Sequence, residues 1–205
     1  MVKLGDICNI LDNLRKPIKE NERISGCYPY YGASGIVDYV SDYIFDGVFV
    51  LIGEDGSVIN EDGNPVVNWA EGKIWVNNHA HIIQEKEKVL LRYIFYFIQT
   101  IKIKNLIKGN IPKLTGKDLK ALQINIPPIE VQQKIADILS TQDKLIELKQ
   151  NLIDNKKQQK KWLMQNLLTG KIRLKGFSDK WEKVKLGNLC KISTGNKNTQ
   201  DKIDN

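Results

Sequence analysis

Residues 127–168 read PPIEVQQKIADILSTQDKLIELKQNLIDNKKQQKKWLMQNLL, and this stretch decides how the chain is organised. The two prolines end whatever precedes them, and residues 130–168 contain neither proline nor glycine. Steps of three and four residues form a heptad seam, apolar at its start and polar in its middle. The seam consists of Val131, Ile135, Ile138, Gln142, Leu145, Lys149, Leu152, Lys156, Gln159 and Leu163.

The pattern predicts one long helix, with Gly170 as its C-cap after Thr169. At 1.5 Å per residue the helix is roughly 60 Å long, too long to be buried in the preceding domain. Much of it is therefore expected to project, and a projecting helix with an apolar seam needs a partner helix. The apolar contacts are expected at Val131, Ile135, Ile138, Leu145, Leu152 and Leu163. The alternative is an ordinary long surface helix.

The part before the prolines has the pattern of short strands and turns. Residues 39–51 are rich in Val, Ile, Tyr and Phe, and residues 48–52 form a tight apolar run with the length of a buried strand. Residues 69–83 predict one or two more strands, and residues 89–101 have helical spacing. Thr115 with Asp118 predicts a second helix start, and residues 123–126 a short strand.

These elements predict the α+β fold class, with three parts. Residues 1–128 form one globular α/β domain, residues 129–170 the long helix, and residues 171–205 the start of a second repeat with a polar tail. The repeat is visible because residues 2–10, VKLGDICNI, return as residues 184–192, VKLGNLCKI, identical at six of nine positions. The second copy of about 20 residues is too short for a core of its own.

Composition narrows the class of protein. The chain of 205 residues has no apolar run of membrane-spanning length and no signal-peptide core, so it is expected to be cytoplasmic and away from membranes. Three distant cysteines, Cys8, Cys27 and Cys190, form no CxxC pair and are interpreted as buried small apolar side chains.

The net charge of +7 is unevenly distributed. Residues 38–71 contain eight acidic side chains and no basic one, whereas residues 102–120 contain six lysines and one acid. A second basic run occupies residues 156–175, and it either contacts DNA or docks a partner. Such segregation suits a protein with one face toward a polyanion, although lysine runs are also common on solvated surfaces. The acidic stretch is expected to face away from DNA or toward a protein partner.

Six stretches together resemble a known family. They are residues 28–35, YPYYGASG; 45–57, FDGVFVLIGEDGS; 77–81, NNHAH; 111–115, IPKLT; 126–135, IPPIEVQQKI; and 167–173, LLTGKIR. Each stretch alone is weak, but their order and spacing resemble the specificity subunit of type I restriction-modification systems. The resemblance covers residues 1 to about 192.

The resemblance implies two target-recognition domains, each followed by a long helix, with the two helices paired as an antiparallel coiled coil. Each domain of such a subunit reads one half of a split site in double-stranded DNA and recruits an adenine-methylating modification subunit; a motor-nuclease restriction subunit joins for cleavage. The present sequence holds one such domain and one helix. The simplest arrangement that supplies the second domain and the second helix is a homodimer, in which the helix of the partner chain replaces the missing one.

The residue types in the first domain suit DNA, with phosphate contacts giving position and base-edge contacts giving sequence. We expect phosphate contacts at Lys102, Lys104, Lys108 and Lys113, with the backbone at Asn110 approaching closely. Base-edge candidates on predicted loops are Arg15, Lys16, Arg23, Tyr30, Tyr31, Ser34, Asn77, Asn78 and His79. Each of these can equally be structural, and the two tyrosines in particular can belong to the core.

Catalytic motifs are not found. The sequence lacks the Asn/Asp-Pro-Pro-aromatic motif of amino-methyltransferases and a glycine fingerprint for a nucleotide cofactor, so no cofactor is expected. His79 and His81 would face one way on a strand, but no third metal ligand is evident, so no metal is expected. The leading hypothesis is a non-catalytic, homodimeric specificity subunit. The alternatives are an interaction module that pairs without reading DNA, and, much less favoured, a nuclease.

Overall fold

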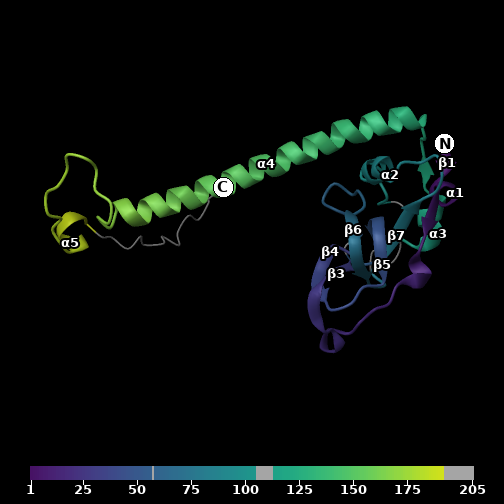
Figure 1. The fold of residues 1–205 in the computed structure, drawn as a ribbon, viewed down its shortest axis with the longest axis horizontal. Helices are drawn as coiled ribbons and strands as arrows, with labels where there is room; N and C mark the ends of the chain where they lie inside the picture. The colour runs from purple at the N-terminus through teal and green to yellow at the C-terminus, as the bar shows by residue number, and fades with distance from the viewer. Residues whose placement is uncertain (57, 105–112, 192–205) are drawn as a thin grey trace, which may run out of the picture. The chain divides into compact units, whose positions relative to one another are not determined.

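The computed structural model describes residues 1–56, 58–104 and 113–191, and the chain divides into two compact units between Leu145 and Ile146. The first unit contains a mixed six-stranded sheet in the order β2-β7-β5-β6-β3-β4 and a small sheet of β1 and β8 (Figure 1). Its strands are β1 Val2–Lys3, β2 Cys8–Ile10, β3 Ser25–Gly32, β4 Gly35–Val40, β5 Phe45–Gly53, β6 Val67–Val76, β7 Ala80–Glu85 and β8 Gln123–Ile124. The helices are α1 Leu4–Ile7, α2 Leu91–Ile98, α3 Gly116–Ala121, α4 Ile129–Leu167 and α5 Leu186–Leu189, with 3-10 turns at Asp12–Leu14 and Glu20–Glu22. The predicted α+β class is confirmed.

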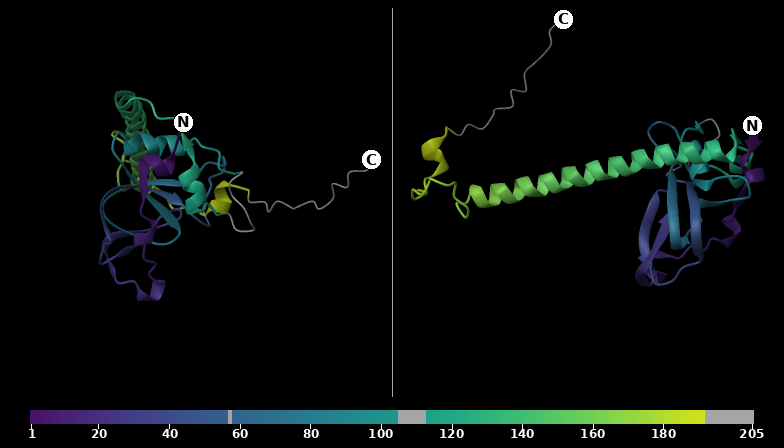
Figure 2. Two further views of the ribbon diagram at one scale, coloured as in Figure 1. Left: turned by 90° about the vertical axis from the view of Figure 1, so that its right-hand side faces the viewer. Right: turned by 45° about the horizontal axis from the view of Figure 1, so that its top comes forward.

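Strand β5 lies at the centre of the large sheet, antiparallel to both β6 and β7. Phe49 and Leu51 pack into a core on one face, while Val50 and Ile52 pack into a second core on the other. A strand buried on both faces has no solvent side, which explains why residues 48–52 form an unbroken apolar run. Helix α2 covers the second core and contacts β5 and β6 (Figures 1 and 2).

A second hairpin adds the other edge of the sheet. Strands β3 and β4 are joined by the two-residue turn Ala33-Ser34, followed by Gly35, whose φ of +123° is a conformation that side chains disfavour. Strand β3 then pairs in parallel with β6, through Tyr30 with Trp75 and Tyr31 with Val76. This parallel register places the end of β3 beside the end of β6, where the β6–β7 turn begins.

Helix α4 begins directly after Pro127-Pro128, as predicted, and its first turns pack on the sheet domain. Gln132 is 1% exposed; its side-chain oxygen accepts from the Leu90 N–H at 2.9 Å, and its amide nitrogen donates to the Pro127 carbonyl at 2.9 Å. Ala136 is also buried, and Ile135 packs against the core. Ile135, which was expected in the partner seam, is thus partly covered by the domain itself.

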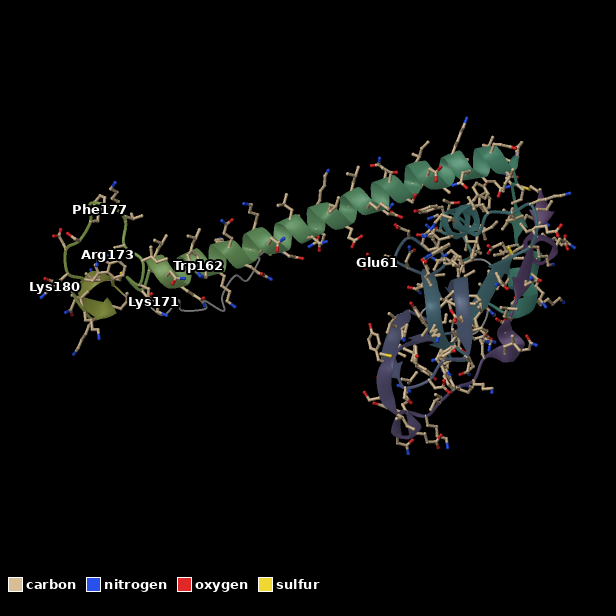
Figure 3. All side chains as sticks on the ribbon, in the orientation of Figure 1. Glu61, Trp162, Lys171, Arg173, Phe177 and Lys180 are labelled. Atoms are coloured by element: carbon tan, nitrogen blue, oxygen red, sulfur yellow. The ribbon has the colours of Figure 1, made fainter. Side chains whose placement is uncertain are left out.

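The other predicted seam residues carry exposed side chains. Val131, Ile138 and Leu145 in the first unit are 42%, 63% and 43% exposed, and Leu152 and Leu163 in the second are exposed as well. Further apolar side chains are exposed on the second unit's part of α4, among them Trp162 (Figure 3). Helix α4 therefore presents apolar surface that the described residues of this chain leave uncovered.

The sequence repeat is also a structural repeat. Helices α1 and α5 follow Lys3 and Lys185 in the same extended conformation, and each ends with a cysteine N–H bonded to the first helical carbonyl. In the first copy Leu4 is fully buried against the second core, whereas its counterpart Leu186 is 64% exposed. The local sequence therefore sets the turn, and the surrounding domain decides whether the leucine is buried.

The cysteine interpretation holds for only one of the three residues. Cys8 is buried, and burial raises the pKa of its thiol to about 12. Cys27 lies exposed near the start of β3, and Cys190 lies exposed after α5, where the described chain has nothing to cover it. Among the described residues, no helix is both long and apolar enough to cross a membrane.

Candidate nucleic-acid interface

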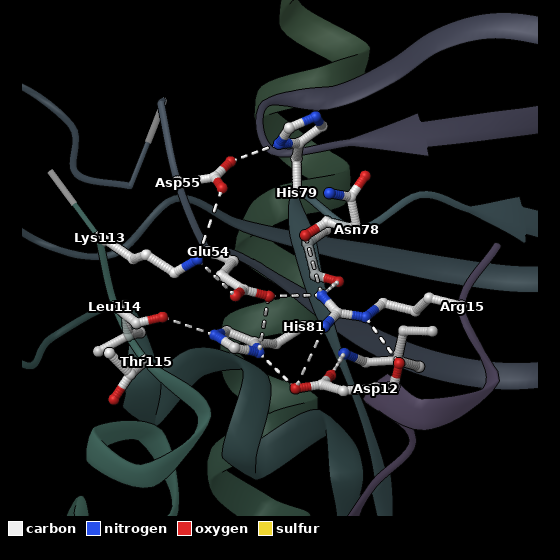
Figure 4. A network of polar contacts seen from close by, with 12 residues as sticks. Asp12, Arg15, Glu54, Asp55, Asn78, His79, His81, Lys113, Leu114 and Thr115 are labelled. Atoms are coloured by element: carbon white, nitrogen blue, oxygen red, sulfur yellow. Dashed lines mark hydrogen bonds and ion pairs between the residues drawn. The ribbon is translucent and has the colours of Figure 1, made fainter. Parts of the chain in front are cut away.

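A network of charged side chains lies at the end of β5 (Figure 4). The Arg15 guanidinium donates to the Glu54 carboxylate at 2.6 Å and to the carbonyls of Ala80 and Asn78 at 2.8 and 3.2 Å. Its second terminal nitrogen lies 3.7 Å from the Asp12 carboxylate. The Arg15 side chain is only 12% exposed, so these acceptors replace most of its water.

His81 completes the network from β7. Its side chain is 1% exposed, with Nε2 at 2.8 Å from the Leu114 carbonyl and Nδ1 at 2.6 Å from the Asp12 carboxylate. Each ring nitrogen of His81 thus faces an oxygen, one from the Leu114 carbonyl and one from the Asp12 carboxylate. The Arg15 guanidinium contacts the carboxylates of both Asp12 and Glu54 and offsets their charge.

The Asp12 carboxyl responds to these neighbours. Burial alone raises its pKa, but the His81 hydrogen bond and the charges of His81 and Arg15 outweigh burial. The backbone N–H of Ile82 adds a further hydrogen bond at 3.2 Å. The pKa of Asp12 is therefore held below its ordinary value, which keeps the carboxylate ionised inside the network.

Asp12, Glu54 and His81 also have the spacing of metal ligands, so the predicted lack of a third ligand beside His81 is wrong. The network nevertheless already contains its own cation, since Arg15 contacts both carboxylates. The two histidines were expected to share one face of a strand, and this prediction is wrong. His79 lies in the turn before β7, and its partner is Asp55 rather than Asp12.

The network continues outward from Glu54 to Asp55, Lys113 and His79. The Lys113 ammonium lies 3.2 Å from the Glu54 carboxylate and 3.9 Å from that of Asp55. The other Asp55 oxygen lies 2.5 Å from Nδ1 of His79. Backbone contacts support the same arrangement, because Asp55 and Lys113 form a β-bridge and the Leu114 N–H donates to the Glu54 carbonyl at 2.8 Å.

Several predicted DNA-contacting residues are structural. Tyr30 is 1% exposed, and its hydroxyl lies within hydrogen-bonding distance of the Ile18 backbone; Tyr31 is buried in the first core. Both assignments to base reading are wrong, because the pairing of β3 with β4 and β6 places these rings inside. Arg15 is held by the network, and Arg23 pairs with Asp38 at 3.2 Å while lying 4.6 Å from the centre of the Tyr30 ring.

Other candidates remain accessible. Side chains that reach solvent are those of Lys16, Ser34, Asn78, His79, Lys102, Lys104 and, in part, Lys113. Lys108 and Asn110 lie outside the described residues. Asn77 is 7% exposed, and its side-chain oxygen accepts from the His79 N–H at 2.8 Å, so it shapes the turn that presents its neighbours.

The acidic stretch 38–71 and the lysine run 102–120 contact each other at two points. Lys113 pairs with Glu54 and Asp55, and the Lys102 ammonium donates to the Asp62 carbonyl at 2.7 Å. Both contacts join the acidic stretch 38–71 to the lysine run 102–120. Of these contacts, the one at Lys113 places a lysine beside two acidic side chains, and the one at Lys102 is to a backbone carbonyl.

An open hollow of about 480 Å³ lies beside this network. Its wall is formed by the β3–β4 turn at Gly32 and Ala33, the segment Asp55-Gly56, and the β6–β7 turn at Asn77 and His79. The sheet register brings these three segments together, since β3 and β6 end side by side and β5 pairs with β7.

Comparison with known proteins gives the family. Residues 1–156 match the family model described as the type I restriction modification DNA specificity domain. The chain belongs to this family. A specificity domain thus accounts for the whole sheet domain and the first two thirds of α4.

Curated relatives carry specificity-subunit names. A Haemophilus influenzae protein provisionally named type I restriction enzyme specificity subunit S.HindORF215P is 43% identical over 137 residues, 66% of this chain and 35% of that protein. The Methanocaldococcus jannaschii type I restriction enzyme MjaVIII specificity subunit is 27% identical over 219 aligned positions, 95% of this chain and 50% of that protein. The chain therefore spans between a third and a half of the length of these two relatives.

Solved structures show the same specificity-domain fold. The crystal structure of the type I restriction-modification S subunit from M. genitalium matches with a TM-score of 0.60 and 19% identity, over 75% of this chain and 41% of that one. A chain from a structural study of type I restriction-modification complex assembly and conformational transition matches with a TM-score of 0.57 and 20% identity, over 78% and 42%.

The charged network was missed by sequence reasoning, and little in the sequence signals it. Asp12 and His81 are 69 positions apart, and Arg15 and Glu54 are 39 apart. The one local signal is Glu54-Asp55, two acids placed directly after the central apolar strand. These two acids follow β5 at the end of the sheet where the β3–β4 turn and the β6–β7 turn also lie.

Substitution of Asp12 by Asn tests the network through pH. The Asp12 carboxyl has a lowered pKa when folded, so its stabilising effect is complete above the unfolded pKa and is lost as pH falls through the folded pKa. We expect Asp12→Asn to lower the free energy of unfolding at about pH 7, with a gap to the unsubstituted protein that narrows below about pH 4. Urea unfolding across this range measures the gap.

The matched control is Asp42→Asn, an exposed carboxyl whose hydrogen bond is to the next residue's N–H. It should leave the stability profile nearly unchanged. A gap between Asp12→Asn and the unsubstituted protein that stays constant with pH would show that Asp12 does not stabilise the fold as a carboxylate.

Proposed function

We propose that this chain is the DNA-reading subunit of a type I restriction-modification complex. The observation that carries the proposal is the family match over residues 1–156, which covers the recognition-domain fold together with the packed start of α4. In this role the sheet domain binds one half of a bipartite site in double-stranded DNA. Partner subunits, an adenine methyltransferase and a motor-nuclease, then methylate or cleave.

The proposed role is recognition without catalysis. The relatives carry the name of the specificity subunit, which is the name of a subunit within a larger restriction enzyme. The ionisable cluster of the domain also fits this role, because its carboxylates and cations are paired with one another and hold loops in place. Assembly with partner subunits agrees with the complex-assembly study that contains the second structural match.

The proposed assembly has two chains joined through α4. Val131, Ile138, Leu145 and Leu152 recur every seven residues, a spacing that suits a second helix lying alongside. The sheet domain covers the side of α4 that contains Gln132 and Ala136, and these four side chains lie outside that contact. A second copy in antiparallel orientation would place two identical recognition domains on an inverted-repeat site.

The decisive experiment is co-expression of this chain with its modification subunit in a host that lacks adenine methylation, followed by genome-wide mapping of N6-methyladenine. A palindromic split motif is the expected result. An asymmetric motif would mean that the chain pairs with a different specificity chain. Absence of methylation, with both proteins soluble and associated, would contradict DNA reading and favour an interaction module instead.

The helix pairing has its own test. We expect the chain to have the mass of a dimer, and Leu145→Glu with Leu152→Glu to convert it to a monomer, because two charges would enter an apolar contact. Sedimentation or light scattering measures the mass. Asn151→Glu, on the same stretch of α4 but outside the seam, is the matched control and should remain dimeric. A monomeric unsubstituted chain would contradict the homodimer.

Phosphate contacts are tested by salt. If Lys102 and Lys104 contact phosphates, their replacement by Ala should lower the slope of log affinity against log salt by about 0.9 for each lysine. The binding affinity of the complex for its own site is measured at several salt concentrations. Lys180→Ala, an exposed lysine in the segment after α4, is the control and should leave the slope unchanged. Unchanged slopes for all variants would exclude the two lysines from the phosphate contacts.

A further inference from the structure

We propose that the hollow between the Ala33-Ser34 turn and the Asn78-His79 turn receives the major-groove edge of one base pair of the half-site, and that His79 reads it as a hydrogen-bond acceptor. The inference rests on the proposed function, which makes double-stranded DNA the ligand. Beyond that function, it specifies where on the domain the base pair binds, which side chain contacts it, and which class of base is recognised.

The hollow has a rigid frame. Asn77 is nearly buried, its N–H donates to the Tyr31 carbonyl at 3.0 Å, and its side-chain oxygen accepts from the His79 N–H at 2.8 Å. On the opposite wall, Gly32 lies so close to Val37 that an added Cβ would come within 3.1 Å of that side chain. A frame held this way can present a side chain in one position, which base reading requires.

His79 is the side chain that this frame presents. Its side chain is 50% exposed, and its Nδ1 is bonded to the Asp55 carboxylate at 2.5 Å (Figure 4). Because the carboxylate only accepts, Nδ1 carries the hydrogen. In the neutral ring Nε2 then carries a lone pair and acts as an acceptor. Asp55 thereby decides which hydrogen-bonding group His79 offers to the hollow.

Asp55 is itself held in place. Lys113 lies 3.9 Å from its second oxygen, and the backbones of Asp55 and Lys113 form a β-bridge. The lysine contributes a second effect, since it offsets the negative charge that Asp55 and Glu54 would otherwise present to phosphates. An acidic pair at the hollow is therefore compatible with DNA, and the carboxylate remains available to orient the histidine.

The chemistry of Nε2 selects the base. In the major groove, adenine and cytosine present an exocyclic amino group, whereas guanine and thymine present a carbonyl oxygen at the equivalent position. A lone pair on His79 accepts from the amino group and is repelled by the carbonyl. The geometry thus points to adenine or cytosine at one position of the half-site. Ser34 and Asn78, exposed on the flanking turns, are placed to contact neighbouring bases or phosphates.

The test uses the complex of this chain with its modification subunit and compares methylation motifs. His79→Ala removes the acceptor and should lower the preference for the amino-bearing base at one position about tenfold, with the other positions unchanged. Asp55→Asn provides a second variant. Its amide can donate to Nδ1, which leaves the hydrogen on Nε2 and should shift the preference at the same position toward guanine or thymine.

The matched control is Asp46→Asn, an exposed carboxyl on β5 outside the hollow, which should leave the motif unchanged. Assembly of every variant complex is checked by gel filtration. If His79→Ala does not assemble, the Asp55→Asn motif decides.

The outcomes separate the two proposals. An unsubstituted complex with no sequence motif overturns the proposed function itself. A motif that stays identical at every position in both variants overturns only the reading role of His79. Uniformly weaker methylation with the same base preference also overturns it, since His79 would then position the domain or a protein partner without reading a base.

Discussion

The pairing of largely buried polar groups among Asp12, Arg15, Glu54 and His81 is the constraint on which the arrangement of the turns around the hollow depends. Two carboxylates, a guanidinium and an imidazole are largely removed from water here, and an unpaired member would cost several kcal/mol. These groups come from the N-terminal loop, the end of β5 and the start of β7, and the backbone at Leu114 joins them. Satisfying the charges therefore places four separate segments at once, and these segments support the turns around the hollow.

Helix α4 obeys a different constraint, because a long helix is stabilised mainly by what covers its apolar face. Its first turns meet this condition through Gln132, Ile135 and Ala136, all packed on the sheet domain. Val131 lies next to Gln132 in sequence, which on a helix is about 100° around the axis. Val131, Ile138 and Leu145 of the heptad series are exposed, whereas Ile135, about 40° around the axis from Val131, borders the domain contact. A second helix along the series would therefore pack directly beside that contact.

The sequence predicted those helices and strands that are determined by residues close together in the chain. The unbroken run 48–52 became the doubly covered β5, the two prolines preceded α4, and the Thr115 hydroxyl accepts from the Asp118 N–H at the start of α3. Predictions failed where the burial of a side chain depends on a segment far away in the sequence. Tyr30 and Tyr31 lie beside a turn-forming stretch but are buried by parallel pairing with β6, about 45 residues away in sequence. The network could not be predicted for the same reason, since neither Asp12 nor His81 has a local pattern that identifies its partner.

The arrangement separates side chains that are paired inside the fold from side chains that reach solvent on the turns. Replacing Asp12 or Glu54 removes a carboxylate partner from the largely buried Arg15 guanidinium, so such changes are costly. Ser34, Asn78 and His79 lie on turns and reach solvent, so other side chains fit there without unpairing a buried charge. Asp55 belongs to both groups, because it pairs with Lys113 and also sets the hydrogen on His79. In the proposed reading role of His79, a change at Asp55 would alter the hydrogen-bonding group at the hollow, while the contacts among Asp12, Arg15, Glu54 and His81 would remain. Specificity would then change without a change in the buried network.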